Sequence, residues 1–139
     1  MPKRPIDQDL ARIPLFSALS KAHLRNLSSL ATAIHVPAGR VLMREDEPGE
    51  ELVVIVEGEA EIRRDGKTIA TRGPGDFFGE ISLLLDRPHT ASVVATTDMT
   101  LQVIGRRAFK ALLKEDPQLY EPLLHAAVER LAELEAKAP

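Results

Sequence analysis

The stretch that decides the fold combines a glycine-led turn, an apolar run, a short loop and a second apolar segment: Phe78-Gly79-Glu80-Ile81-Ser82-Leu83-Leu84, then Leu85-Asp86-Arg87-Pro88-His89, then Thr90-Ala91-Ser92-Val93. The chain reaches Gly79 from an irregular loop, where ligands usually bind, since residues 73–76 read Gly-Pro-Gly-Asp. A glycine that opens a short helix lets backbone N–H groups approach an anion, and the helix dipole favours the negative charge. The stretch therefore predicts a small anion-binding turn, although Gly-Glu alone is also typical of an ordinary strand-to-helix turn.

Around this stretch, residues 34–104 consist of short β-branched runs separated by Gly, Pro and Asp turns. This texture predicts an all-β roll. Asp65-Gly66 is the clearest hairpin turn, and the basic residues beside it predict a solvated hairpin tip rather than a binding patch.

Helical periodicity brackets the β region. Ser20 is a candidate N-cap for a helix over Lys21–Ala33, and a second helix is expected after Gly105. Asp116-Pro117 is expected to cap and begin the last helix. Its apolar stripe is predicted to pack against the roll or against a second copy of the chain: Tyr120, Leu124, Ala127, Leu131, Leu134.

Composition narrows the function classes. The 139 residues suit one domain, and the net charge of −3 argues against nucleic acid as a partner. The chain has no cysteine and no apolar run long enough to cross a bilayer. We therefore expect a cytoplasmic protein without disulfides, thiolate metal sites or membrane contact.

The whole pattern resembles the cyclic nucleotide-binding domain family. The family's phosphate-binding cassette runs Phe-Gly-Glu-(Leu/Ile)-(Ala/Ser)-Leu, a loop, then Arg-(Ala/Thr/Ser)-Ala-(Thr/Ser)-Val, and residues 78–84 match its first half throughout. Alignment of the second half on Ala91-Ser92-Val93 places His89 where the family has its arginine. The resemblance covers about residues 10–135 and includes the Pro-Ala-Gly run at 37–39.

The resemblance implies a mainly β fold with flanking helices. This is a β-roll, or jelly-roll-like barrel, with an N-terminal helix, a short cassette helix and two C-terminal helices. The expected single domain comprises an N-terminal helical segment at 6–33, the roll at 34–104 with its cassette at 78–93, and hinge and lid helices at 105–137. No helix-turn-helix follows in this sequence, so the resemblance is to a stand-alone module.

The resemblance also implies the ligand site. Glu80 would bind the ribose 2′-hydroxyl, and the amides of Gly79, Glu80 and Ile81 would face ribose and phosphate. Thr90 would offer a hydroxyl to the phosphate. The remaining cassette positions in the expected site are Ser82, His89 and Ala91.

The last helix touches the base in the family, which adds Tyr120 and Arg130 as further candidates. The pattern itself favours Tyr120 in the core, and Arg130 and His125 on the surface.

His89 leaves three outcomes open. Arginine offers phosphate a permanent planar charge, whereas an imidazole with a pKa of about 6.5 is mostly neutral near pH 7. The pocket could bind weakly, bind in a pH-dependent way, or keep the fold without the ligand. Arg87 could also replace the missing cation, although Pro88 restricts the backbone between Arg87 and His89.

We expect a regulatory sensor that binds a cyclic nucleotide, with cAMP favoured over cGMP only by family frequency, and that needs no cofactor or metal. An unknown effector protein would take its output, and a homodimer through the helix at 117–135 is a further hypothesis. The four histidines form no His-x-His pair, and no Gly-x-Ser-x-Gly or Walker-type motif occurs, so we expect no catalysis. The alternative is an interaction or dimerisation scaffold with a vestigial pocket.

Overall fold

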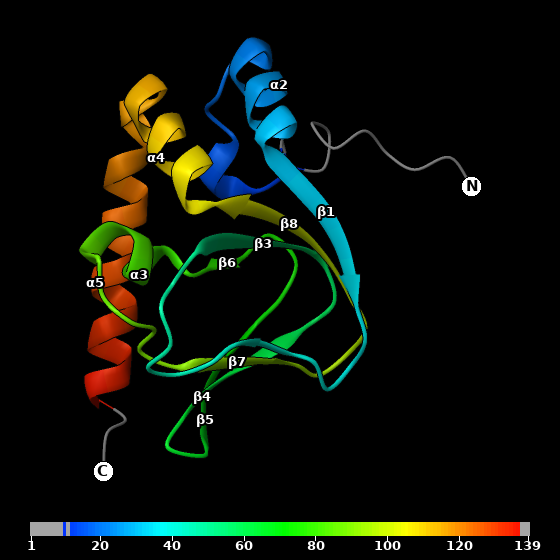
Figure 1. Cartoon of the computed structure of the whole chain (residues 1–139), viewed down its shortest axis with the longest axis vertical. Coiled ribbons are helices and arrows are strands. Elements are labelled where there is room, and N and C mark those ends of the chain that lie inside the picture. The colour runs from blue at the N-terminus through cyan, green and yellow to red at the C-terminus, as the bar shows by residue number, and fades with distance from the viewer. Residues whose placement is uncertain (1–9, 11, 137–139) are drawn as a thin grey trace.

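The computed structural model describes residues 10 and 12–136, and in them two antiparallel sheets form a roll with helices at one end and along one side (Figure 1). One sheet has the order β1 (Ala31–Val36), β8 (Met99–Gly105), β3 (Glu51–Glu57), β6 (Phe77–Phe78). The other has the order β2 (Val41–Met43), β7 (Ser92–Ala95), β4 (Ala60–Arg64), β5 (Lys67–Arg72). The predicted mainly β roll is confirmed.

The central strand β3 is buried on both faces, because the roll covers one face and the helices cover the other. Val53 and Ile55 belong to the core inside the roll, with Phe78 and Val93. The alternate residues Leu52 and Val54 belong to the helix-side core. This double burial explains why β3 reads as a continuous apolar run rather than an alternating one. The β4–β5 hairpin turns at residues 65–66, as predicted.

The N-terminal helices η1 (Pro14–Phe16) and α2 (Lys21–Leu30) lie with α4 (Arg106–Glu115) over the outer face of the first sheet. The predicted cap is confirmed, because the backbone N–H of His23 donates to Ser20 Oγ at 3.2 Å. The predicted helix over Lys21–Ala33 is too long: it ends at Leu30, and the sheet begins at Ala31 instead of residue 34. Residues from Ala31 onward pair with β8 across the sheet, and this long-range ladder overrides the local helical period. Residues 6–9 and 11 of the expected N-terminal segment lie outside the described residues.

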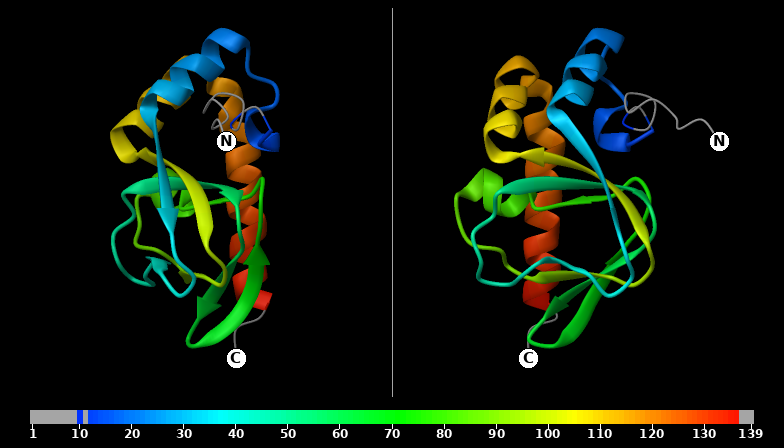
Figure 2. Two further views of the ribbon diagram at one scale, coloured as in Figure 1. Left: turned by 90° about the vertical axis from the view of Figure 1, so that its right-hand side faces the viewer. Right: turned by 45° about the vertical axis from the view of Figure 1, so that its right-hand side comes forward.

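The C-terminal part consists of η2 (Pro117–Leu119) and the long helix α5 (Tyr120–Ala136), which runs along the roll past the cassette helix α3 (Glu80–Leu85) (Figure 2). Asp116 does not cap the last helix as expected. It precedes η2 without a side-chain cap, and its fully buried carboxylate pairs with His23 Nδ1 at 2.6 Å. Residue 137 of the expected lid segment lies outside the described residues.

The apolar stripe of α5 is wider than the face that it buries. Leu123, Ala127 and Leu134 are buried, whereas Tyr120 and Leu124 are each 44% exposed. The expectation that Tyr120 is a core residue is therefore wrong. None of the helices in the described part of the chain is both long and apolar enough to cross a membrane.

Candidate functional site

The structure forms the glycine-led turn into a short helix that the sequence predicts. Gly79 has φ +97° and directly precedes α3. A Cβ at this position would overlap the backbone carbonyl oxygen of Glu51, so both the dihedral angle and the space call for glycine. Glu80 and Ser82 follow this turn in α3, and both are buried, each 1% exposed.

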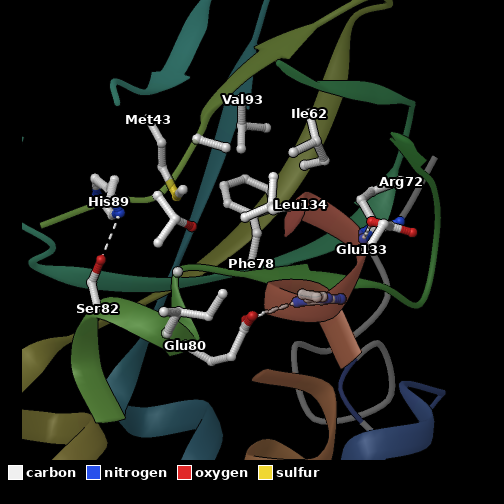
Figure 3. A pocket seen from close by; sticks show the side chains of 15 residues that line it. Met43, Ile62, Arg72, Phe78, Glu80, Ser82, His89, Val93, Glu133 and Leu134 are labelled. Carbon is white, nitrogen blue, oxygen red and sulfur yellow. Dashed lines mark hydrogen bonds and ion pairs between the residues drawn. The ribbon is translucent and has the colours of Figure 1, made fainter. Parts of the chain in front are cut away.

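A pocket lies between α3, the second sheet and α5 (Figure 3). Its lining includes every cassette residue expected to bind ligand: Gly79, Glu80, Ile81, Ser82, His89, Thr90, Ala91. Of the three further candidates, Arg130 lines the pocket, whereas Arg87 and Tyr120 are exposed and do not. The structure thus gathers residues from the cassette and from the last helix around one cavity.

His89 is fixed in the pocket wall and is only 8% exposed. Its Nδ1 lies 2.9 Å from Ser82 Oγ. Its backbone N–H donates to the Glu47 carbonyl at 2.9 Å, and its carbonyl accepts from Asp46 N–H at 2.9 Å. Gly49 makes this packing possible, because a Cβ there would lie 3.1 Å from His89 Cε1.

Burial lowers the pKa of the His89 imidazole, and the nearby Glu47 carboxylate opposes this shift to a smaller extent. The ring is therefore neutral at pH 7, and at most one of its nitrogens then carries a hydrogen to donate. The family's arginine position thus holds no cation at neutral pH in this chain.

The Glu80 carboxylate forms an ion pair with an arginine of α5. Arg130 Nη1 donates to both Glu80 carboxylate oxygens at 2.7 Å, as the dashed lines at Glu80 in Figure 3 mark. The Arg130 guanidinium also lies over the Phe77 ring, 4.6 Å from its centroid. The expectation that Arg130 is a surface residue is wrong, because its side chain is only 16% exposed.

A second ion pair and an apolar contact hold the same end of α5 to the roll. Arg72 Nη2 donates to Glu133 Oε1 at 3.1 Å, and Leu134 is buried against Ile69 and Ala91. Sequence reasoning did not place Arg72, Glu133 or the wall residues Met43 and Ile62 in the site. One usable signal was that Arg130 stands three residues after Ala127 and four before Leu134, on the face that α5 buries.

The pocket lining is electrically balanced, since its two arginines face two glutamates in ion pairs. The remaining wall is largely apolar, with Phe78, Val93 and Leu134 prominent in it. No group of three or more His, Asp or Glu side chains that could hold a metal occurs among residues 10 and 12–136. The pocket thus combines an apolar wall with two ion pairs and the buried His89.

Comparison with known proteins identifies relatives of this chain. A family model described as Cyclic nucleotide-binding domain matches residues 33–116. The cAMP-dependent protein kinase regulatory subunit of Aspergillus niger is 35% identical over 117 residues, which cover 80% of this chain and 28% of that subunit.

Two solved structures share the fold. The structure described as "cAMP bound PfPKA-R (141-441)" has a TM-score of 0.84 at 25% identity and covers 94% of this chain and 45% of its own. The regulatory subunit of a cAMP-independent protein kinase A from Trypanosoma brucei has a TM-score of 0.71 at 30% identity, with coverages of 86% and 47%. The chain thus spans less than half of each of these relatives.

Proposed function

The chain belongs to the cyclic nucleotide-binding domain family, and we propose that it binds a cyclic nucleotide, cAMP in preference to cGMP, in the pocket between α3, the second sheet and α5. The observation that carries the proposal is that all seven cassette residues expected from the sequence line one cavity. Glu80 would accept the ribose 2′-hydroxyl, and Thr90 with the amides at the start of α3 would meet the phosphate. The preference for cAMP rests on relatives such as the A. niger regulatory subunit, which is named as cAMP-dependent.

We further propose that binding is weak near neutral pH and strengthens in acid. The phosphate is an anion, His89 is neutral at pH 7, and Arg72 and Arg130 already face carboxylates. Relative to an arginine, the histidine forgoes about 1 to 3 kcal/mol of charged hydrogen bonding. A bound phosphate would raise the pKa of His89, so binding takes up a proton, and affinity increases by at most about tenfold for each pH unit of acidification.

The proposed role is regulatory rather than catalytic. Binding would change the position of α5, and an effector protein would take up that change. The exposed residues Tyr120, Leu124 and Val128 on α5 supply an apolar surface for a homodimer through residues 117–135. We place this activity in the cytoplasm.

A second candidate function is an interaction scaffold with a vestigial pocket. Two observations favour it: the neutral His89, and a cavity of only about 50 Å³, where ligand pockets usually measure about 300 to 1,000 Å³. The T. brucei relative, described as part of a cAMP-independent kinase, shows that the fold occurs in a protein named for independence of this ligand.

Thermal unfolding tests both functions. The native protein, His89→Arg and Arg87→Ala are melted at pH 6 and pH 8 with and without millimolar cAMP, cGMP or adenosine. Ligand at a hundred times its dissociation constant stabilises by about 2.7 kcal/mol, which raises Tm by several degrees. Adenosine reports what the phosphate adds, and the exposed Arg87 is the matched control for loss of a nearby cation.

We expect cAMP to raise Tm of the native protein more at pH 6 than at pH 8, and of His89→Arg equally at both. Arg87→Ala should behave as the native protein does. A response of His89→Arg alone would favour the scaffold. No response of any variant would refute cyclic nucleotide binding.

A further inference from the structure

We propose that the free edge of β1 is an interaction surface for a second copy of this chain, which adds its own β1 antiparallel to it with Ile34 on the two-fold axis. The proposal does not depend on a ligand, because none of residues 31–36 lines the pocket between α3, the second sheet and α5. It also differs from a homodimer through α5, since β1 and α5 lie on opposite sides of the roll (Figure 1).

The first support is that β1 has an open edge in the described part of the chain. It is the outermost strand of the first sheet and pairs with β8 alone. Residues 32–35 are exposed one after another, and the large apolar side chain of Ile34 among them is 36% exposed. An open edge presents unpaired backbone N–H and C=O groups, which form a template for a further strand.

The second support is that the other three edge strands of the two sheets carry protection that β1 lacks. β6 has two residues, and β2 has three and a register shift in its ladder with β7. β5 is as long as β1, but it carries Lys67 and Arg72, and its ladder with β4 has a register shift. Short length, charge and bulges are the usual devices against pairing between edges. β1 keeps an unbroken register with β8 over its six residues and contains no lysine, arginine, aspartate, glutamate or proline.

The absence of charge favours a second copy as the occupant. Neither β1, with the sequence ATAIHV, nor its neighbour β8, with the sequence MTLQVIG, has an acidic or basic residue other than His35. Two copies of a chain with a net charge of −3 can therefore meet at this edge without like charges opposite each other. The β-branched residues of β1 also suit pairing with their own kind, since such cross-strand pairs stabilise antiparallel ladders.

Symmetry limits the register of this pairing. Backbone groups point alternately to the two edges of a strand, so a strand pairs antiparallel with its own copy only when one residue faces itself across the axis. With Ile34 on the axis, the ladder covers residues 32–36 and stops short of Leu30, where α2 ends. Ala33 then faces His35, and the exposed Ile34 is covered by its copy.

Disulfide crosslinking tests the pairing, because the chain has no cysteine. Residues that face each other in an antiparallel ladder have Cα atoms about 4.5 to 5.5 Å apart, within the reach of a disulfide. Ile34→Cys is compared with Leu85→Cys, the matched control, which replaces an apolar side chain of similar exposure on α3. A ladder over residues 32–36 is short and the contact weak, so it is captured covalently rather than followed by sedimentation.

Disulfide dimers are quantified on non-reducing gels during mild oxidation. Each rate is divided by the rate at which the same thiol reacts with a small disulfide reagent, so that the ratio reports the approach of two copies rather than the reactivity of the thiol. We expect this ratio to be at least tenfold higher for Ile34→Cys than for Leu85→Cys.

The register is tested with two further variants. An equimolar mixture of Ala33→Cys and His35→Cys should form mixed dimers with the same tenfold excess over Leu85→Cys, because these residues face each other. Ala33→Cys should hardly couple with itself, since its own copy lies on the diagonal, beyond the reach of a disulfide. The mixture also keeps the proposal testable if Ile34→Cys does not fold.

Ratios for Ile34→Cys and for the mixture equal to that of Leu85→Cys would refute the pairing, and faster self-coupling of Ala33→Cys than of Ile34→Cys would refute the register. Coupling that occurs only after removal of residues 1–9 would mean that this segment, rather than a second copy, lies on the edge, which also refutes the proposal. The assay contains no cyclic nucleotide, so its outcome is independent of the proposed function.

Discussion

Replacement of Gly49 by alanine tests the packing that fixes His89 in the pocket wall. Gly49 is not in the left-handed region, so an alanine there meets no backbone strain. The space is the obstacle. A Cβ would overlap Ser82 Cβ and lie 2.8 Å from Ser82 Oγ and 3.1 Å from His89 Cε1. Ser82 is 1% exposed and lies in α3, so it cannot turn away into solvent.

The expected cost follows from a matched variant. Gly73→Ala makes the same chemical change where a Cβ meets nothing within 4 Å and φ is again outside the left-handed region. Both variants gain the same stabilisation of about 0.4 to 1 kcal/mol from a stiffer unfolded chain. The difference between them isolates the overpacking at Gly49, which should destabilise by about 1 to 3 kcal/mol. For a chain of this size that difference separates the two Tm values by roughly 3 to 12 °C.

Equilibrium unfolding in urea, monitored by circular dichroism, gives the free energy of unfolding of each variant. The set is Gly49→Ala, Gly73→Ala, Ser82→Gly and the double variant Gly49→Ala with Ser82→Gly. Ser82→Gly removes the overlapping Cβ, so the double variant should be more stable than the sum of the single effects predicts. Equal urea midpoints for Gly49→Ala and Gly73→Ala would contradict the predicted overlap between a Cβ at Gly49 and the Ser82 side chain. Strict additivity of the Gly49→Ala and Ser82→Gly effects would contradict it as well.

Two further variants test the pocket and the outer face of α5. Because burial lowers the pKa of His89, the unfolded chain binds more protons than the folded one in mild acid. Stability should therefore be complete above about pH 6.5 and fall as pH drops towards the folded pKa, and His89→Gln should remove this part of the pH dependence; identical profiles in urea unfolding from pH 5 to pH 8 would contradict it. Val128→Lys, at a position 66% exposed beside the exposed Leu124, should abolish a homodimer in sedimentation while changing the free energy of unfolding by less than about 0.5 kcal/mol. A native protein that is monomeric at millimolar concentration would rule the dimer out.

The features that the sequence determined by itself are those set by neighbouring residues. The glycine turn before α3, the Asp65-Gly66 hairpin and the Ser20 cap each depend on the dihedral preferences or hydrogen bonds of a few consecutive residues. The cassette could be proposed as a site because its motif lies within one short segment and resembles that of a known family. One short segment, residues 78–93, carries most of the lining, and residues from both of its halves lie around one cavity.

Tertiary structure alone decided where the local signals end and what each side chain faces. Ala31 leaves its helix because it pairs with Ile104, far along the chain. Asp116 forgoes the predicted cap because His23 approaches it from α2. Glu80 meets Arg130 of α5, fifty residues later, and both side chains line the pocket. A buried charged side chain needs a partner, and the tertiary packing decides which residue lies close enough to be that partner. Helical periodicity predicts which face of a helix is buried, but it does not predict which residue of another element contacts that face.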